Sequence, residues 1–142
     1  MTWTEVADRL AGARTYWLGS TTTSGAPHAA PVWGVVTGET LHLYSERSTV
    51  KARNLAADPR CTLTTDDARN PVVLDGVASR VAEPGPIGEF VAAVNEKYAA
   101  GLTVDFQDPA VNGTFVVTPH RVIALTDGDF TGSPTRWTFP TT

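Results

Sequence analysis

The sequence contains a single cysteine, Cys61, among its 142 residues. One cysteine excludes an internal disulfide framework and a zinc site built from four thiolates, and it is typical of a reducing compartment. The chain also lacks a basic-then-apolar leader and any apolar run near the ~20 residues that a membrane span requires. These absences predict one domain over residues 1–142, located in the cytoplasm and without a membrane partner.

Basic residues are few as well. Eleven Lys and Arg against fifteen Asp and Glu give a net charge of −4. A nucleic-acid-binding domain normally shows the opposite excess, so we expect no nucleic-acid partner. The common phosphate-loop, dinucleotide, serine-hydrolase and zinc-protease motifs are missing. The three histidines, His28, His42 and His120, stand far apart without a carboxylate at ligand spacing, so no metal site is predicted.

What is abundant is β-branched residues. The chain has 21 Thr, 16 Val and 2 Ile but only 9 Leu, which favours strands over helices. Alternation and turn residues predict strands over 15–21, 28–36, 41–44, 61–65, 71–81, 114–117 and 121–125, with a possible bulge at Gly76. Helical spacing predicts helices over 2–12, 48–57 and 87–100, the first with a Thr2/Glu5 capping box. Closely spaced strands with few inserted helices predict a mainly β, α+β chain that forms a small antiparallel barrel.

The segment 45–55 is the richest local signal for chemistry. Ser48 and Thr49 lie where a strand leads into a helix, whose N–H groups and positive dipole end favour an anion. Lys51 and Arg53 add two cations within about a turn, which suits a phosphate. A capped helix with a solvated basic face is the alternative interpretation.

The segment 29–35 is unusual for a strand. Pro31 removes a ladder donor and Gly34 removes a side chain. This pattern indicates either an irregular edge strand or a place where a flat group lies against the backbone, and a planar aromatic cofactor is one candidate.

The order of four segments, 16–21, 25–33, 41–45 and 51–60, resembles the flavin and deazaflavin oxidoreductases of the pyridoxamine 5′-phosphate oxidase-like superfamily. The Lys51-Ala52-Arg53-Asn54-Leu55 segment, followed by Asp-Pro, is most similar to the branch that uses the deazaflavin coenzyme F420.

This resemblance implies a split β-barrel homodimer with the cofactor ring in a groove between the subunits. The implied phosphate-binding residues are Thr49, Lys51 and Arg53, with Ser45, Ser48 and Asn54 close by. The strand implied to back the ring holds Pro31, Val32 and Trp33, and the implied tail pair that reaches the partner's cofactor is Arg136 and Trp137.

The implied function is hydride transfer from reduced coenzyme F420 to an electron-poor small-molecule acceptor, with the chemistry supplied by the cofactor. An enzyme of the same fold that uses FMN, and a non-enzymatic binder of a flavin, haem or tetrapyrrole, are the alternatives. A homodimer is also expected from the residues themselves, because the meander carrying Trp17, Val32, Trp33 and Val35 is very apolar and the C-terminal tail holds aromatic residues that need a docking surface.

Overall fold

The computed structural model describes residues 1–37, 40–46, 49–102 and 112–140, without the side chains of residues 44–46 and 112. The helices are α1 (Trp3–Gly12), α2 (Val50–Ala57) and α3 (Pro84–Tyr98), with a short 3-10 helix over Asp127–Asp129. The strands are β1 (Tyr16–Thr21), β2 (Pro27–Val32), β3 (Gly34–Thr37), β4 (Thr40–Glu46), β5 (Arg60–Thr65), β6 (Val72–Val81), β7 (Asn112–Ala124) and β8 (Thr135–Thr138). Within the described residues, no helix is long and apolar enough to cross a membrane.

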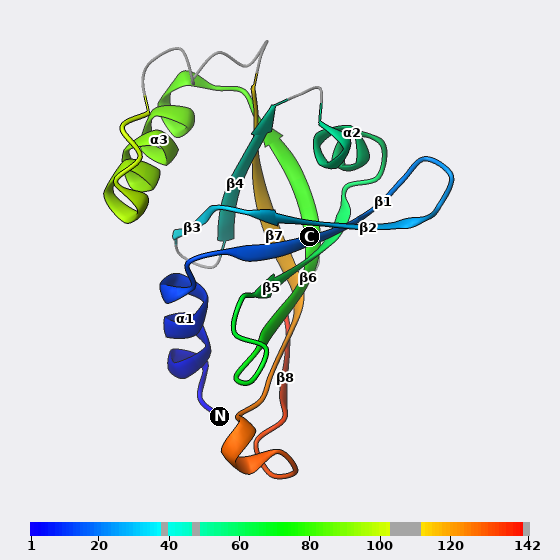
Figure 1. The fold of residues 1–142 in the computed structure, drawn as a ribbon, viewed down its shortest axis with the longest axis vertical. Coiled ribbons are helices and arrows are strands. Elements are labelled where there is room, and N and C mark those ends of the chain that lie inside the picture. Colours follow the sequence, from blue (N-terminus) through cyan, green and yellow to red (C-terminus); the bar gives the residue numbers. More distant parts are fainter. Residues whose placement is uncertain (38–39, 47–48, 103–111, 141–142) are drawn as a thin grey trace.

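The strands form one curled antiparallel sheet. Its order is β2-β1-β5-β6-β7-β4-β3, and β8 pairs with the C-terminal part of β7. Figure 1 shows β1 and β2 running across the direction of β4, β6 and β7, so the sheet curls into a half-barrel. The predicted split antiparallel barrel with peripheral helices is therefore confirmed.

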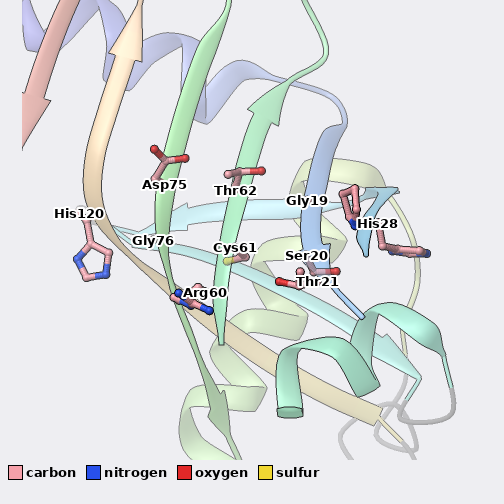
Figure 2. Close-up of a pocket in the computed structure, with 11 residues that line it drawn as sticks. Gly19, Ser20, Thr21, His28, Arg60, Cys61, Thr62, Asp75, Gly76 and His120 are labelled. Atoms are coloured by element: carbon pink, nitrogen blue, oxygen red, sulfur yellow. The ribbon is translucent and has the colours of Figure 1, made fainter. Parts of the chain in front are cut away.

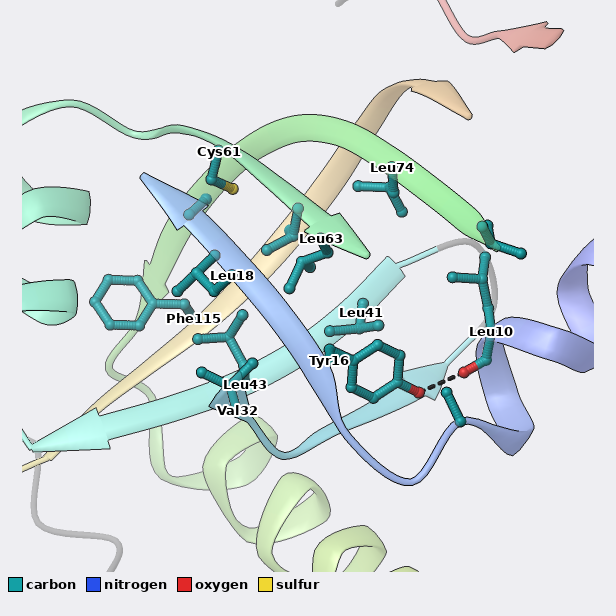
Figure 3. Close-up of a cluster of buried hydrophobic side chains, with 14 of the residues drawn as sticks. Leu10, Tyr16, Leu18, Val32, Leu41, Leu43, Cys61, Leu63, Leu74 and Phe115 are labelled. Carbon is teal, nitrogen blue, oxygen red and sulfur yellow. Dashed lines mark hydrogen bonds between the residues drawn. The ribbon is translucent and has the colours of Figure 1, made fainter. Parts of the chain in front are cut away.

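The main hydrophobic core lies inside the curl. Alternate residues of β1 and β5 point inward, and Tyr16, Leu18 and Leu63 are fully buried there (Figure 3). Helix α1 covers one end of this core with Val6 and Leu10. A second, smaller apolar cluster joins α3 to β3 on the outside of the barrel.

The predicted capping box at the start of α1 is confirmed. The backbone N–H of Thr2 donates to Glu5 Oε2 over 2.7 Å, and the backbone N–H of Glu5 donates to Thr2 Oγ1 over 3.3 Å. These two bonds satisfy backbone donors that a helix start otherwise leaves unpaired.

The strand predicted over 28–36 is two strands, because the chain bends at Trp33. A Cβ added to Gly34, the next residue, would lie 2.9 Å from Leu41 Cδ2 and 3.2 Å from the backbone oxygen of His42. Only glycine allows β3 to approach β4 and Tyr16 this closely.

The strands predicted on either side of Pro119 are one strand, β7. Its pairing with β6 shifts by one residue, since Asp75 faces Arg121 while Gly76 faces Pro119. The predicted irregularity at Gly76 is confirmed, and a bulge is where a strand tolerates proline.

Helix α3 begins at Pro84, earlier than the predicted residue 87. The segment Pro84-Gly85-Pro86 forms the first turn, where proline's missing N–H costs no helical hydrogen bond.

Part of the aromatic tail docks within the chain. Trp137 of β8 and Phe139 both pack edge-on against Trp3. The Trp3 ring centroid lies 5.6 Å from that of Trp137 and 5.3 Å from that of Phe139. Phe130 remains 67% exposed.

Candidate cofactor site

The N-terminus of α2 is capped as the sequence suggests. Thr49 has extended backbone angles, and its Oγ1 accepts a hydrogen bond from Ala52 N over 3.4 Å. Lys51 lies in the first turn, which contains no acidic residue. A cation at this end opposes the helix dipole, so its presence without a carboxylate is electrostatically unfavourable unless an anion binds.

Lys51 and Arg53 lie on different sides of α2. Residues two positions apart in an α-helix are separated by a rotation of about 200° around the helix axis. Lys51 is half-buried, whereas Arg53 is exposed and lines a hollow shared with β6 and β7. The structure therefore does not place the two cations in one cradle within a single chain.

The other predicted residues around α2 have different surroundings. Asn54 is 4% exposed, and its Nδ2 donates to Ser20 Oγ over 3.2 Å, which fastens α2 to β1. Ser45 pairs with Gly113 in the sheet, but its side chain lies outside the described part of the structure. Ser48 also lies outside the described residues.

The segment implied to back the ring runs along β2 to the bend. Val32 is 5% exposed and belongs to the barrel core, so it can offer only backbone to a ligand. Pro31 is exposed, and Trp33 is 36% exposed. The Trp33 indole stacks on the Tyr98 ring with centroids 4.3 Å apart and planes 1° from parallel. We call this stacked pair the Trp33 platform.

The end of α3 holds the bend beneath the Trp33 platform. Tyr98 Oη accepts from Gly34 N over 3.1 Å and donates to Gly34 O over 3.0 Å. Lys97 Nζ donates to Gly34 O over 2.9 Å and to Tyr16 Oη over 3.0 Å. Tyr16 Oη in turn donates to Leu10 O (Figure 3). Both backbone polar groups of Gly34 are thus bound by α3, which fixes the orientation of the bend.

Cations surround these rings. Arg14 Cζ lies 4.8 Å from the Tyr98 ring centroid, and Lys97 Nζ lies 4.9 Å from that of Tyr16. Burial lowers the pKa of Lys97, and the neighbouring Arg14 charge lowers it further. Burial raises the pKa of Tyr16, so its hydroxyl stays protonated and can donate to Leu10.

The sequence interpretation missed Lys97 and Arg14 in this cluster. Tyr98 lies four residues after the buried Val94 on the buried face of α3, and Lys97 lies three residues after Val94 on nearly the same face. A lysine beside the apolar face of a predicted helix was the sequence signal that could have identified this cluster.

Arg136 and Trp137 lie away from α2 in this chain. Both are on β8, which Figure 1 places near the N-terminus at the end of the barrel opposite α2. Trp137 is packed on Trp3, and Arg136 is exposed. Within one chain, this pair and the α2 terminus do not form one site.

A shallow hollow of about 480 Å³ crosses β1, β5 and β6, with His28 and His120 on opposite sides (Figure 2). His28 Nδ1 is buried and has no hydrogen-bond partner among the described residues. Burial raises the pKa of Cys61 to about 12, so its thiol is protonated at neutral pH. No group of three or more His, Cys, Asp or Glu in the described part of the chain is arranged to hold a metal ion.

Solved structures share this fold. A haem-binding protein from Mycobacterium smegmatis is 25% identical with a TM-score of 0.78, and the match covers 94% of this chain and 56% of that one. A conserved hypothetical protein from Mycobacterium tuberculosis is 25% identical with a TM-score of 0.77, and the match covers 100% of this chain and 94% of that one. An F420 reductase is 24% identical with a TM-score of 0.66, and the match covers 81% of this chain and 94% of that one. This likeness concerns the fold alone. No curated protein matches the chain significantly.

The curled antiparallel sheet and these solved structures define a split-barrel protein. The family profile described as pyridoxamine 5′-phosphate oxidase matches residues 2–126, and the chain belongs to that family.

Proposed function

We propose that the protein is an oxidoreductase that binds the deazaflavin coenzyme F420 and transfers a hydride to an electron-poor small molecule. The observation that carries this proposal is the capped N-terminus of α2, with Lys51 and no acidic residue in its first turn. A phosphate there would interact favourably with the helix dipole and with the lysine, and would offset the unfavourable placement of that cation.

The surface beside α2 suits a flat ring on a phosphate-bearing arm. Ser20, to which α2 is fastened, pairs with His28 near the start of β2, and Trp33 follows the end of that strand. Five residues of strand span about 16 Å. The α2 helix that would hold the anion and an exposed, rigid aromatic face therefore lie near the two ends of one strand.

The roles of this chain's residues follow from those positions. Thr49 and Lys51 would hold the phosphate, while Pro31 and the Trp33 platform would support the ring. The bonds from Lys97 and Tyr98 to Gly34 keep that support rigid, so less ordering is needed on binding. The reduced deazaflavin supplies the hydride when bound, and the chain supplies binding, orientation and exclusion of water.

We further propose that two copies form the site. Val32 and Val35, which contributed to the expectation of a dimer, are buried in the chain's own cores. The apolar surface left for a partner includes Trp17, 49% exposed, and Trp33. In a homodimer, Arg136 and Trp137 of one copy would approach the cofactor of the other. Light scattering should give twice the 15.1 kDa chain mass, and a value of one chain mass would contradict the dimer.

FMN is the alternative cofactor, since the α2 terminus would bind its phosphate equally. Haem binding without catalysis is the second candidate, favoured by the 25% identity to the mycobacterial haem-binding protein. This chain spans 56% of the length of that protein, so the comparison extends to only part of it.

Titration of the purified protein with coenzyme F420, FMN and haem tests the proposal. We expect Lys51→Ala to weaken coenzyme F420 binding by roughly tenfold to a hundredfold, from the loss of one charge-assisted contact of about 1.5–3 kcal/mol. Arg69→Ala is the control, because Arg69 lies in an exposed ion pair with Asp127 and away from α2. Nanomolar FMN binding without coenzyme F420 binding would refute the choice of cofactor, and equal affinities for Lys51→Ala and wild type would refute the site.

A further inference from the structure

Two cationic side chains lie beside the Tyr98 ring of the Trp33 platform. Arg14 Cζ lies 4.8 Å from the centroid of that ring, and Lys97 Nζ lies 5.2 Å from it. Tyr98 in turn stacks on Trp33, with the two centroids 4.3 Å apart. Both cations are therefore close to the aromatic surface that the proposed function assigns to a planar ring.

The accessible side of the platform belongs to Trp33. Tyr98 covers one face of the indole and is itself 5% exposed, whereas Trp33 is 36% exposed. Stacked aromatic rings have centroids roughly 4.5–7 Å apart, so a ring on the other face of Trp33 would have its centre no more than about 16 Å from the Arg14 guanidinium. An arginine stays protonated at every working pH, so its charge acts on that ring throughout.

Hydride transfer changes the charge of such a ring. Uptake of a hydride without a further proton adds one negative charge, and release of the hydride removes it. A nearby cation attracts the form with the additional negative charge more strongly than the other form. We propose that Arg14, together with Lys97, is a specificity-determining cation of the Trp33 platform that favours the more negatively charged form of the bound ring. This inference rests on the proposed function, which assigns the ring to this platform.

A carboxylate, Asp66, also acts on this cluster. Burial and the Arg14 charge lower the pKa of Lys97, whereas the Asp66 charge raises it. Asp66 Oδ2 accepts a hydrogen bond over 3.3 Å from the backbone N–H of Thr15, the residue after Arg14. The Coulomb energies of separate charges add, so removal of the Arg14 charge acts on the ring in the same direction whatever other carboxylates lie near it.

Arg14→Gln tests the charge, with Arg14→Lys as the variant that keeps it. Arg14 is exposed and donates a long bond of 3.4 Å to Lys97 O, so we expect both variants to fold. Oxidised and reduced coenzyme F420 are titrated separately into the full-length protein, without oxygen and at pH 8, and the ratio of their two dissociation constants is the readout. Arg69→Gln is the matched control, because it removes an arginine from an exposed ion pair outside the platform.

The expected change is in the ratio. Arg14→Gln should reduce the preference for the reduced form by roughly twofold to fivefold at low ionic strength, and by less in 0.2 M salt, because the Debye length then falls below about 10 Å. Arg14→Lys and Arg69→Gln should keep the wild-type ratio. A purely structural role of Arg14 would weaken both forms equally, and an unchanged ratio in Arg14→Gln would overturn the proposal.

Asp66→Asn supplies the change of opposite sign. The substitution removes a negative charge, while the amide oxygen can still accept from Thr15 N–H. The preference for the reduced form should therefore increase. A decrease, or the same change as in Arg14→Gln, would show that charge does not set the preference.

A pair of planar probes separates this inference from the choice of cofactor. Failure of coenzyme F420 to bind in either form would contradict the proposed function, but quenching of tryptophan fluorescence by 2-naphthoate and by the neutral 2-naphthamide still tests Arg14. Trp33→Leu identifies the quenching that arises at the platform. We expect the wild type to prefer the acid and Arg14→Gln to lose that preference. An equal preference in both proteins, or no quenching that depends on Trp33, would overturn the proposal.

Discussion

The contact between Tyr98 and Gly34 gives the sharpest test of how the Trp33 platform is built. Tyr98 is 5% exposed, and its hydroxyl bonds both backbone groups of the buried Gly34. In Tyr98→Phe the ring can still stack on Trp33, and Gly34 O keeps its bond from Lys97. Gly34 N–H, however, loses its acceptor in a buried position.

The magnitude follows from that single unpaired donor. Leaving a buried N–H without a partner costs roughly 1–3 kcal/mol. For a domain of this size, each kcal/mol lowers the melting temperature by about 3–4 °C, so a decrease of about 3–12 °C is expected. Urea unfolding should show a lower midpoint with an unchanged slope, since the surface exposed on unfolding is the same.

Thr118→Val is the control for removing a hydroxyl, because Thr118 is exposed on β7. Its melting temperature should stay close to that of wild type. If Tyr98→Phe melts within about a degree of this control, the hydroxyl does not hold the bend, and the reasoning is refuted. Under the proposed function, Tyr98→Phe should also weaken cofactor binding, whereas Thr118→Val should not.

Two further predictions concern titratable groups. Cys61, with a pKa of about 12 and 7% exposure, should resist iodoacetamide at pH 8 in the folded protein and react in denaturant; rapid labelling of the native protein would contradict its burial. Burial lowers the pKa of His42 below 6.5, so the unfolded state binds more protons between the folded pKa and 6.5, and stability should fall as pH drops through that window. His42→Gln should remove this part of the pH dependence of urea unfolding, and an identical pH profile in both proteins would show that His42 is not its source.

Several features could be predicted from the sequence because they depend on neighbouring residues. The Thr2/Glu5 capping box and the Thr49 cap of α2 each arise from residues close together in the chain. The antiparallel fold could be predicted for the same reason, since strand alternation and turn residues are local. Of the candidate site, the sequence predicted the capped N-terminus of α2 and the unusual strand that leads to Trp33.

The tertiary structure decided the features that depend on distant contacts. The bend after Val32 is held by Lys97 and Tyr98, more than 60 positions away, and no local pattern specifies that contact. The continuity of β7 through Pro119 depends on a bulge against the distant strand β6, in which His120 of β7 has no paired residue. Helical spacing alone separates Lys51 from Arg53, but only the packing of α2 on the sheet shows which of them faces outward beside Arg80. Burial and juxtaposition are properties of the packed chain, because they depend on which remote elements cover each side of a helix or strand.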